Sequence, residues 1–144
     1  MLGRLAHWLR LLGYDSAYGA HLTGRALLRA ARAEQRILLT RRRALLRHLD
    51  VPHLFIESDH FRQQLAQVIR AYQLDVDSRL LRRCPECNLE LLTESRSTAA
   101  ARVPPFVAQT QEQFRSCPGC HRVFWAGTHH QHIRAELAAL QLER

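Results

Sequence analysis

The sequence predicts an α/β fold in which helices flank a small parallel sheet, followed by a ribbon of short strands built on two cysteine turns. Two observations carry this prediction. Helix-like and strand-like segments alternate through residues 1–80, as expected when helices connect parallel strands. All four cysteines then fall in two Cys-x-x-Cys pairs within residues 81–144. We therefore expect two domains, an α/β domain over residues 1–80 and a ribbon with a C-terminal helix over residues 81–144.

The first two helices are predicted from the spacing of their apolar residues. The leucines at helical spacing near the N-terminus are Leu2, Leu5, Leu9 and Leu12. Gly13 suits the position just after a helix, because glycine adopts the left-handed backbone freely. A loop or short strand is expected over residues 14–21, and a second helix over residues 24–35 with Thr23 as its N-cap.

Two short apolar runs, Arg36–Thr40 and His53–Glu57, are predicted to be the strands of the parallel sheet. The segment between them, residues 41–48, predicts a helix. Ser58 suits the N-cap of a further helix, whose apolar residues continue at helical spacing to Tyr72. This order of helices and strands is the one that builds a small parallel sheet covered by helices.

The second half predicts short strands around the cysteine turns. These strands are expected over residues 90–92, 114–116 and 122–125. Thr93–Arg102 is polar and predicts a loop. Val103–Val107 predicts an extended segment, because each proline biases the preceding residue away from helix. Ile133, Leu137 and Leu140 recur at helical spacing and predict a closing helix.

The cysteine pairs predict a metal site. The four candidate ligands are Cys84, Cys87, Cys117 and Cys120, with 29 residues between the pairs. A two-residue gap lets both sulfurs of a pair turn onto one ion, and two pairs supply the four thiolates of a tetrahedral zinc site. Asn88 and His121 follow the second cysteines, and both residue types tolerate a left-handed backbone. We expect one structural zinc ion with no open position for chemistry.

Other uses of the cysteines explain less of the pattern. Two disulfides would need an oxidising compartment, and a redox Cys-x-x-Cys motif would explain one pair but not the second. No apolar run approaches the ~18 residues of a membrane span. Arg4 and Arg10 interrupt the first apolar segment, which argues against a secretory signal. A cytoplasmic protein without a membrane segment is therefore expected.

Positive charge is concentrated in the first part of the chain. Residues 1–83 carry 15 arginines and 7 acidic residues, whereas residues 84–144 carry six of each. A basic surface favours RNA or another polyanion as the partner, and a basic surface without a partner is the alternative. Arg41, Arg42 and Arg43 follow an apolar strand, where three guanidinia would attract phosphate. The alternative for this run is a solvated helix start.

The chain resembles the Mut-seven C-terminal RNase domain family over about residues 1–133. The similar segments are Leu2–Ala6, Trp8–Asp15, Arg36–Thr40, Arg83–Asn88, Cys117–Trp125 and Gly127–His129. Their combination and order are specific. The resemblance implies a PIN-like nuclease fold followed by a zinc ribbon, and a role directed at RNA.

Two departures from the family pattern bear on catalysis. PIN-like nucleases use several carboxylates at strand ends to hold divalent ions, magnesium or manganese, which activate water. In the family a strand with an aspartate precedes the first helix, whereas here Met1 stands directly before Leu2. The family also tends to show Thr-Arg-Asp after the later strand, whereas here Arg42 stands at the acidic position. Because an arginine repels a divalent cation, impaired or absent catalysis is expected.

Asp15, Glu57 and Asp59 are the remaining candidate catalytic carboxylates, because they lie near predicted strand ends. Their alternative roles are a turn residue for Asp15, a solvated loop charge for Glu57 and a favourable first-turn helix charge for Asp59. Two explanations of the missing strand stay open. Either the protein starts upstream of Met1, or it has lost the active site and kept the binding surface.

Three functional hypotheses follow. The first is an RNA-binding relative of a PIN-like RNase, with a structural zinc ribbon and impaired or absent catalysis. The second is an active ribonuclease that depends on magnesium or manganese, which requires at least three converging carboxylates. The third is a protein-interaction module in which the ribbon docks a partner protein, and this would expose an apolar patch on the ribbon.

Overall fold

The computed structural model describes residues 2–19, 22, 24–47 and 49–140. Its helices are α1 (Gly3–Leu11), α2 (Gly24–Ala33), α3 (Phe61–Tyr72), α4 (Arg96–Ala99), α5 (Pro105–Thr110) and α6 (Thr128–Ala139), with short 3-10 helices η1 (Arg43–Leu46) and η2 (Ala100–Arg102). Its strands are β1 (Leu38–Thr40), β2 (His53–Phe55), β3 (Leu92–Glu94), β4 (Phe114–Ser116) and β5 (Val123–Trp125). No helix of this described part is long and apolar enough to cross a membrane.

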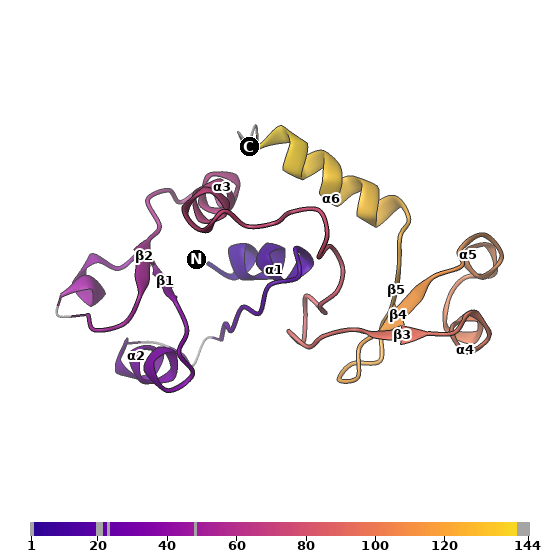
Figure 1. The fold of residues 1–144 in the computed structure, drawn as a ribbon, viewed down its shortest axis with the longest axis horizontal. Coiled ribbons are helices and arrows are strands. Elements are labelled where there is room, and N and C mark those ends of the chain that lie inside the picture. The colour runs from indigo at the N-terminus through magenta and orange to yellow at the C-terminus, as the bar shows by residue number, and fades with distance from the viewer. Residues whose placement is uncertain (1, 20–21, 23, 48, 141–144) are drawn as a thin grey trace.

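The strands form two separate sheets, as Figure 1 shows. β1 and β2 run parallel, with Leu38 opposite His53. β3, β4 and β5 form an antiparallel sheet in that order. The α/β fold class is thereby confirmed: a small parallel sheet with helices precedes an antiparallel, ribbon-like sheet that carries the four cysteines.

The main core lies between α1, α3 and α6. Its buried side chains include Leu5, Leu9, Leu11, Leu12, Ile56, Leu65, Val68, Ile69, Ile133 and Leu137. Except for Ile56, which follows β2, these residues belong to the three helices or their ends, and each helix turns one apolar stripe inward. Gly13 ends α1 at a φ of 96°, and a Cβ there would lie 2.3 Å from the carbonyl oxygen of Arg79. Glycine is required at this position for both its backbone freedom and its small size.

The C-terminal helix α6 returns to the N-terminal part of the chain (Figure 1). Ile133 and Leu137 are buried in the core formed with α1 and α3. Arg62 of α3 donates two hydrogen bonds, each of 2.9 Å, to the Glu136 carboxylate of α6. The predicted domain boundary at residue 80 places α6 in the same domain as the ribbon, and this boundary stays a prediction. The buried face of α6, however, packs on α1 and α3 of the N-terminal part.

A second, smaller core lies beside the antiparallel sheet, where Ala99, Val103 and Phe114 are buried together. The predicted loop over residues 93–102 is wrong here, because β3, α4 and η2 occupy it. The predicted extended segment over residues 103–107 is wrong from Pro105 onward, where α5 begins. Ser95 caps α4 by accepting a hydrogen bond from the Thr98 N–H.

Proline explains the second of these errors. Pro104 keeps the extended backbone that the sequence predicts, with a ψ of 147°. Pro105, however, is the first residue of α5, a position where the missing N–H has no helical partner to lose. A proline pair that signals an extended segment therefore also starts a helix.

Smaller corrections concern the ends of elements. The predicted helix over residues 41–48 is reduced to the short η1. Ser58 does not cap α3 directly; His60 precedes the helix, and its N–H donates to the Ser58 hydroxyl over 3.0 Å. Thr23, the predicted cap of α2, lies outside the described residues. The predicted positions of α1, α2, α3 and α6 are confirmed.

Candidate functional site

The four cysteines converge on one point, where all their Sγ atoms lie within 4.8 Å of one another. The Sγ atoms of Cys84 and Cys120, from different pairs, are 3.8 Å apart. A tetrahedron with zinc–sulfur bonds of about 2.3 Å has edges of about 3.8 Å. The donor set and its spacing therefore fit one tetrahedral zinc ion.

Each cysteine turn is closed by an equivalent backbone hydrogen bond. In the first turn, the Asn88 N–H donates to the Cys84 carbonyl over 2.9 Å. In the second, the His121 N–H donates to the Cys117 carbonyl over 2.9 Å. Asn88 and His121 have φ angles of 61° and 64°, which confirms the predicted left-handed backbone after each pair. Gly119 completes the second turn, since a Cβ there would lie 2.9 Å from the Leu89 side chain.

The four thiols do not ionise independently. Hydrogen bonding with the Cys120 thiol, followed by desolvation, raises the pKa of Cys87 to about 12. Burial raises the pKa of the Cys117 thiol, but hydrogen bonds from the N–H groups of Cys120 and Gly119 outweigh this and bring it to about 7. Without a cation, the Cys117 thiol is thus the one that most readily loses its proton. A divalent ion would favour the thiolate form of all four cysteines and offset two of their four negative charges.

The first cysteine turn is attached to the N-terminal part through Arg10 of α1. Its Nη1 donates to the Pro85 carbonyl over 2.9 Å, and its Nε donates to the Ser16 carbonyl over 2.9 Å. Asn88 completes the attachment, because its Oδ1 accepts from the Ser16 N–H and its Nδ2 donates to Asp15 over 2.7 Å. The cysteine site and the loop after α1 therefore form one hydrogen-bonded network.

Asp15, a candidate catalytic residue, is part of this hydrogen-bonded network. Its carboxylate accepts two hydrogen bonds from the Arg36 guanidinium, of 2.9 and 3.1 Å, in addition to the bond from Asn88. The hydrogen bonds from Arg36 are the largest cause that lowers the pKa of Asp15, and the bond from Asn88 acts in the same direction. An aspartate paired in this way holds a loop in place and has little capacity left for a metal ion.

The three candidate carboxylates are not brought together. Arg36, the partner of Asp15, precedes β1, whereas Glu57 and Asp59 follow β2. Because the two strands are parallel, both N-terminal ends lie at one end of the sheet and both C-terminal ends lie at the other. Asp59 is exposed and lies 3.6 Å from the His60 ring. Over residues 2–19, 22, 24–47 and 49–140, the four cysteines form the only group of three or more histidine, cysteine, aspartate or glutamate side chains that lie close enough together to hold one metal ion.

The arginine run Arg41–Arg43 lies at the carboxyl end of β1, and its members differ in their contacts. Arg41 donates from Nη1 to the Ile56 carbonyl over 3.0 Å. Arg43 lies over the Phe55 ring, with its guanidinium carbon 4.4 Å from the ring centroid. The exposed Arg42 side chain forms no hydrogen bond, ion pair or ring contact with the described part of the chain. Two guanidinia thus bind the end of β2, and the middle one is free for a ligand.

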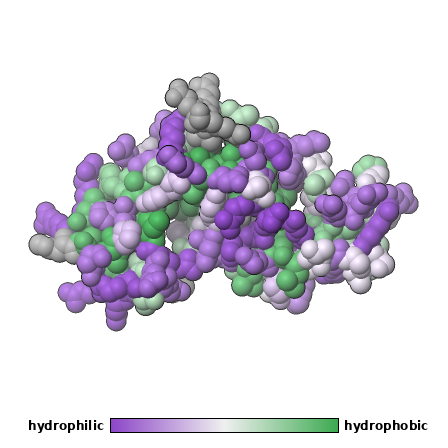
Figure 2. Space-filling model, in the orientation of Figure 1, coloured by the Kyte–Doolittle hydropathy of each residue, from purple (hydrophilic) through white to green (hydrophobic). Residues whose placement is uncertain are grey.

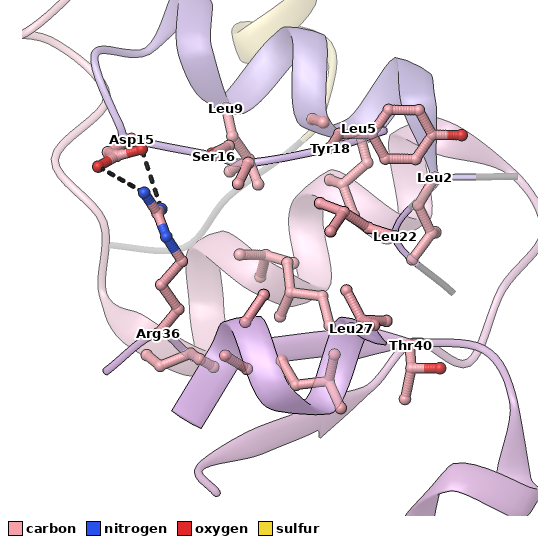
Figure 3. A pocket seen from close by; sticks show the side chains of 18 of the residues that line it. Leu2, Leu5, Leu9, Asp15, Ser16, Tyr18, Leu22, Leu27, Arg36 and Thr40 are labelled. Atoms are coloured by element: carbon pink, nitrogen blue, oxygen red, sulfur yellow. Dashed lines mark hydrogen bonds and ion pairs between the residues drawn. The ribbon is translucent and has the colours of Figure 1, made fainter. Parts of the chain in front are cut away.

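Sequence reasoning missed the residues that join the two parts of the molecule. Arg10 has an observable signal, since it interrupts an otherwise apolar stretch at residues 8–12. The role of the Asn88 side chain has no local signal, because its partners lie more than 70 residues away in the sequence. Nor does the sequence predict the cleft of about 710 Å³ beside β1, which Leu5 and Leu9 line from α1 and Leu27 lines from α2 (Figure 3), because its walls come from segments far apart in the chain.

Comparison with protein families matches residues 1–137 of the chain to the family model described as the Mut7-C RNAse domain. The matched segment spans the parallel sheet, the four cysteines and most of α6. Comparisons with curated proteins and with solved structures gave no match.

Proposed function

The chain belongs to the Mut7-C RNase domain family, and from this premise we propose that it binds RNA, with impaired or absent catalysis. The observation that carries the proposal is the exposed Arg42 at the carboxyl end of β1, where ligands of parallel sheets tend to bind. Its guanidinium has no contact within the described residues and is therefore available to a phosphate oxygen. Arg41 and Arg43 flank it and add positive potential.

A second basic surface supports the same proposal. Arg25 and Arg29 are exposed on α2, one helical turn apart, and neither lines the cleft on the other side of this helix. Figure 2 shows hydrophilic residues over α2, with hydrophobic ones further in toward the sheet. An RNA backbone that runs along α2 toward Arg42 would be recognised through its negative charge and not through the identity of its bases.

The carboxylate positions support the catalytic part of the proposal. Hydrolysis by two divalent ions needs several acidic ligands around one point. Asp15 is paired with Arg36 near the start of β1, and Glu57 and Asp59 lie beyond the end of β2. Arg42 adds a positive charge where the family tends to have an acid. This arrangement favours binding of RNA over cleavage.

For the four cysteines we propose one structural zinc ion, held by Cys84, Cys87, Cys117 and Cys120. Bound there, zinc would supply a crosslink between the two turns and no catalysis, since four protein ligands leave no open position. The hydrogen bonds of Arg10 and Asn88 then extend this crosslink to α1 and to the loop that contains Asp15.

The RNA-binding proposal is tested by measuring the affinity for a labelled single-stranded RNA at several salt concentrations. We expect Arg42→Ala to weaken binding and to reduce the slope of log affinity against log salt by about 0.7, which is one phosphate contact on a single strand. Arg70→Ala is the matched control, because Arg70 is an exposed arginine of α3 without a contact in the described part of the chain. Salt-independent binding, or equal effects of the two variants, would contradict the proposal.

The catalytic part is tested on the same samples with magnesium or manganese. We expect the wild-type protein to bind the RNA without cleaving it. Arg42→Asp restores the acid but not the remaining ligands, so it is expected to gain no activity. Cleavage by the wild-type protein that depends on the divalent ion would instead support the active ribonuclease.

One observation favours a second candidate, a protein-interaction role of the ribbon. Large apolar side chains are exposed around it, with Phe106 73% exposed and Leu92 57% exposed. Exposed apolar surface of this kind is typical of interaction sites. This candidate predicts no measurable affinity for RNA, so the salt titration above separates it from the first.

A further inference from the structure

The four cysteines of the metal site are not equally exposed. Cys84 and Cys117, the first cysteine of each pair, are buried, with exposed fractions of 0% and 1%. Cys87 and Cys120, the second cysteine of each pair, are partly exposed. The site therefore has an inner pair of cysteines, Cys84 and Cys117, and an outer pair that solvent reaches, Cys87 and Cys120.

Hydrogen bonds divide the cysteines in the same way. The Cys87 N–H donates to the Cys84 sulfur over 3.4 Å. The N–H groups of Gly119 and Cys120 donate to the Cys117 sulfur over 3.3 and 3.5 Å. Within the described residues, no N–H donates to the sulfur of either outer cysteine. Because an N–H donor withdraws charge from a thiolate and makes it a weaker nucleophile, the outer thiolates are the more reactive as well as the more accessible pair.

Gly119 leaves the sulfur of Cys87 uncovered. A Cβ at Gly119 would lie 3.4 Å from this sulfur, so any other residue would place a carbon against it. Gly119 is itself exposed. The side chain nearest to the same position is Leu89, whose Cδ1 would lie 2.9 Å from the added Cβ and which is 43% exposed. A small solute can therefore approach the Cys87 sulfur through the space that a side chain would fill.

The outer cysteines are placed to react with each other. They come from different turns, and all four sulfurs lie within 4.8 Å of one another. A disulfide has a sulfur–sulfur distance of about 2 Å, so a small movement of the exposed side chains would suffice to form one. A bond between Cys87 and Cys120 would leave the inner pair as the remaining ligands, and two ligands do not complete a structural zinc site.

We propose that the cysteine site is a switch that responds to peroxide, in which Cys87 is oxidised first and Cys120 forms a disulfide with it. This rests on the structural zinc site proposed above. The Cys87 thiolate attacks one oxygen of hydrogen peroxide, the O–O bond breaks, and hydroxide leaves, which produces a sulfenic acid. The Cys120 thiolate then attacks the Cys87 sulfur and displaces a second hydroxide. The two sulfurs lose two electrons, the peroxide gains them, and two of the four ligands are removed.

Oxidation at this site would also reach the N-terminal part of the molecule. The first cysteine turn is held to α1 by Arg10 and to the loop after α1 by Asn88. Loss of the crosslink between the two turns would loosen the turn to which both side chains bond. A thiol reductant together with zinc would restore the site, since a disulfide is reversible.

The first test measures zinc in the purified wild-type protein by elemental analysis, and then follows its release by hydrogen peroxide with a colorimetric zinc indicator. We expect release in step with the loss of two thiols, and recovery after dithiothreitol and zinc are added. A protein purified without zinc would overturn the metal site and the switch with it. A zinc-loaded protein that keeps its ion in excess peroxide would overturn the switch alone.

The disulfide itself is identified by mass spectrometry of the oxidised wild-type protein. Trypsin cleaves after Arg96 and Arg115, so the two cysteine pairs fall in separate peptides. We expect a disulfide that joins these peptides, and fragmentation should locate it between Cys87 and Cys120. A disulfide within one Cys-x-x-Cys pair, or one between the inner cysteines, would contradict the proposal.

Gly119→Ala tests the approach to Cys87 without removing a ligand. The backbone of Gly119 lies outside the left-handed region, so alanine fits once the end of the Leu89 side chain shifts. We expect this variant to slow zinc release by peroxide about threefold or more, because the added methyl group covers the Cys87 sulfur. Release as fast as in the wild-type protein would show that the oxidant enters elsewhere and contradict the proposal.

Two controls accompany this variant. Gln113→Ala, at an exposed position before β4, should leave the rate of release unchanged. Competition with a chelator should give the same zinc affinity for Gly119→Ala and the wild-type protein, since slower release from tighter binding would refute the role of Gly119. The identification of the disulfide uses the wild-type protein alone, so it does not depend on the folding of either variant.

Discussion

The carboxylate of Asp15 is shared between two partners from distant parts of the chain. Arg36 lies at the start of β1, and Asn88 lies in the first cysteine turn. An aspartate near a predicted strand end is equally compatible with a catalytic ligand and with a turn residue. The partners decide between these, because a carboxylate whose oxygens accept three hydrogen bonds within the protein is held in a structural role.

The structural role of Asp15 gives a prediction for stability. We expect Asp15→Asn to lower the free energy of unfolding by about 1 kcal/mol at pH 7, a value that allows for screening of the half-exposed pair. Denaturant unfolding of both proteins measures the difference. RNA binding should be unaffected, whereas a catalytic or RNA-binding role of Asp15 would alter RNA binding or cleavage without this loss of stability.

The pH dependence of that difference follows from the pKa of Asp15, which is lowered in the folded protein mainly by Arg36. A group whose folded pKa is depressed contributes stability above its unfolded pKa of about 3.9. The difference between wild type and Asp15→Asn should therefore be constant from pH 8 to pH 5. It should shrink below about pH 4, as the carboxyl protonates in both states. A difference that grows as the pH falls would contradict the pairing with Arg36.

Among the elements, α6 has the least expected packing. Its sequence neighbours are the strands of the antiparallel sheet, yet its buried face lies on α1 and α3. Helices pack wherever an apolar stripe of matching length is open, so neighbours in sequence do not decide their partners. The salt bridge between Arg62 and Glu136 lies at this contact and adds orientation more than stability.

The packing of α6 is tested by truncating its most buried side chain. Ile133 is fully buried in the core with α1 and α3. We expect Ile133→Ala to lower the free energy of unfolding by about 2–4 kcal/mol, because it removes apolar contacts and leaves a cavity. Gln131→Ala, at an exposed position of the same helix, should change it by less than about 0.5 kcal/mol. A loss confined to the ribbon, with the N-terminal part still folded, would contradict this packing.

At the scale of the whole molecule, hydrogen bonds connect the cysteine site to the parallel sheet. Arg10 joins the first cysteine turn to α1, and Asn88 joins it to Asp15 and thereby to Arg36 before β1. Arg36 in turn closes one end of the cleft. A metal ion that orders the cysteine turns would thus also order one wall of the cleft, since the same loop belongs to both.

Metal removal tests this connection. We expect one zinc ion per chain by elemental analysis, and its loss in Cys87→Ser. Chelation should cost several kcal/mol and lower Tm by roughly 10 °C or more. Amide hydrogen exchange should increase in the cysteine turns and also in residues 14–19, which bond to the first turn. Increased exchange restricted to the ribbon would contradict the coupling.

The sequence by itself determined the features that depend on near neighbours. Cysteine spacing predicted both metal turns, and apolar periodicity predicted α1, α2, α3 and α6. The residue types Asn88 and His121 indicated that a left-handed backbone is tolerated after each turn. It failed where one local pattern suits two structures, as at Pro105, which follows an extended residue and also starts α5.

Only the tertiary structure decided which distant groups meet. It separated Asp15 from Glu57 and Asp59, because the beginnings and ends of parallel strands lie at opposite edges of a sheet. It also left the Arg42 side chain without a contact in the described part of the chain, while its two neighbours bind the end of β2, and it placed α6 on α1. Such contacts depend on how the chain reverses between elements, and no window of neighbouring residues contains that information.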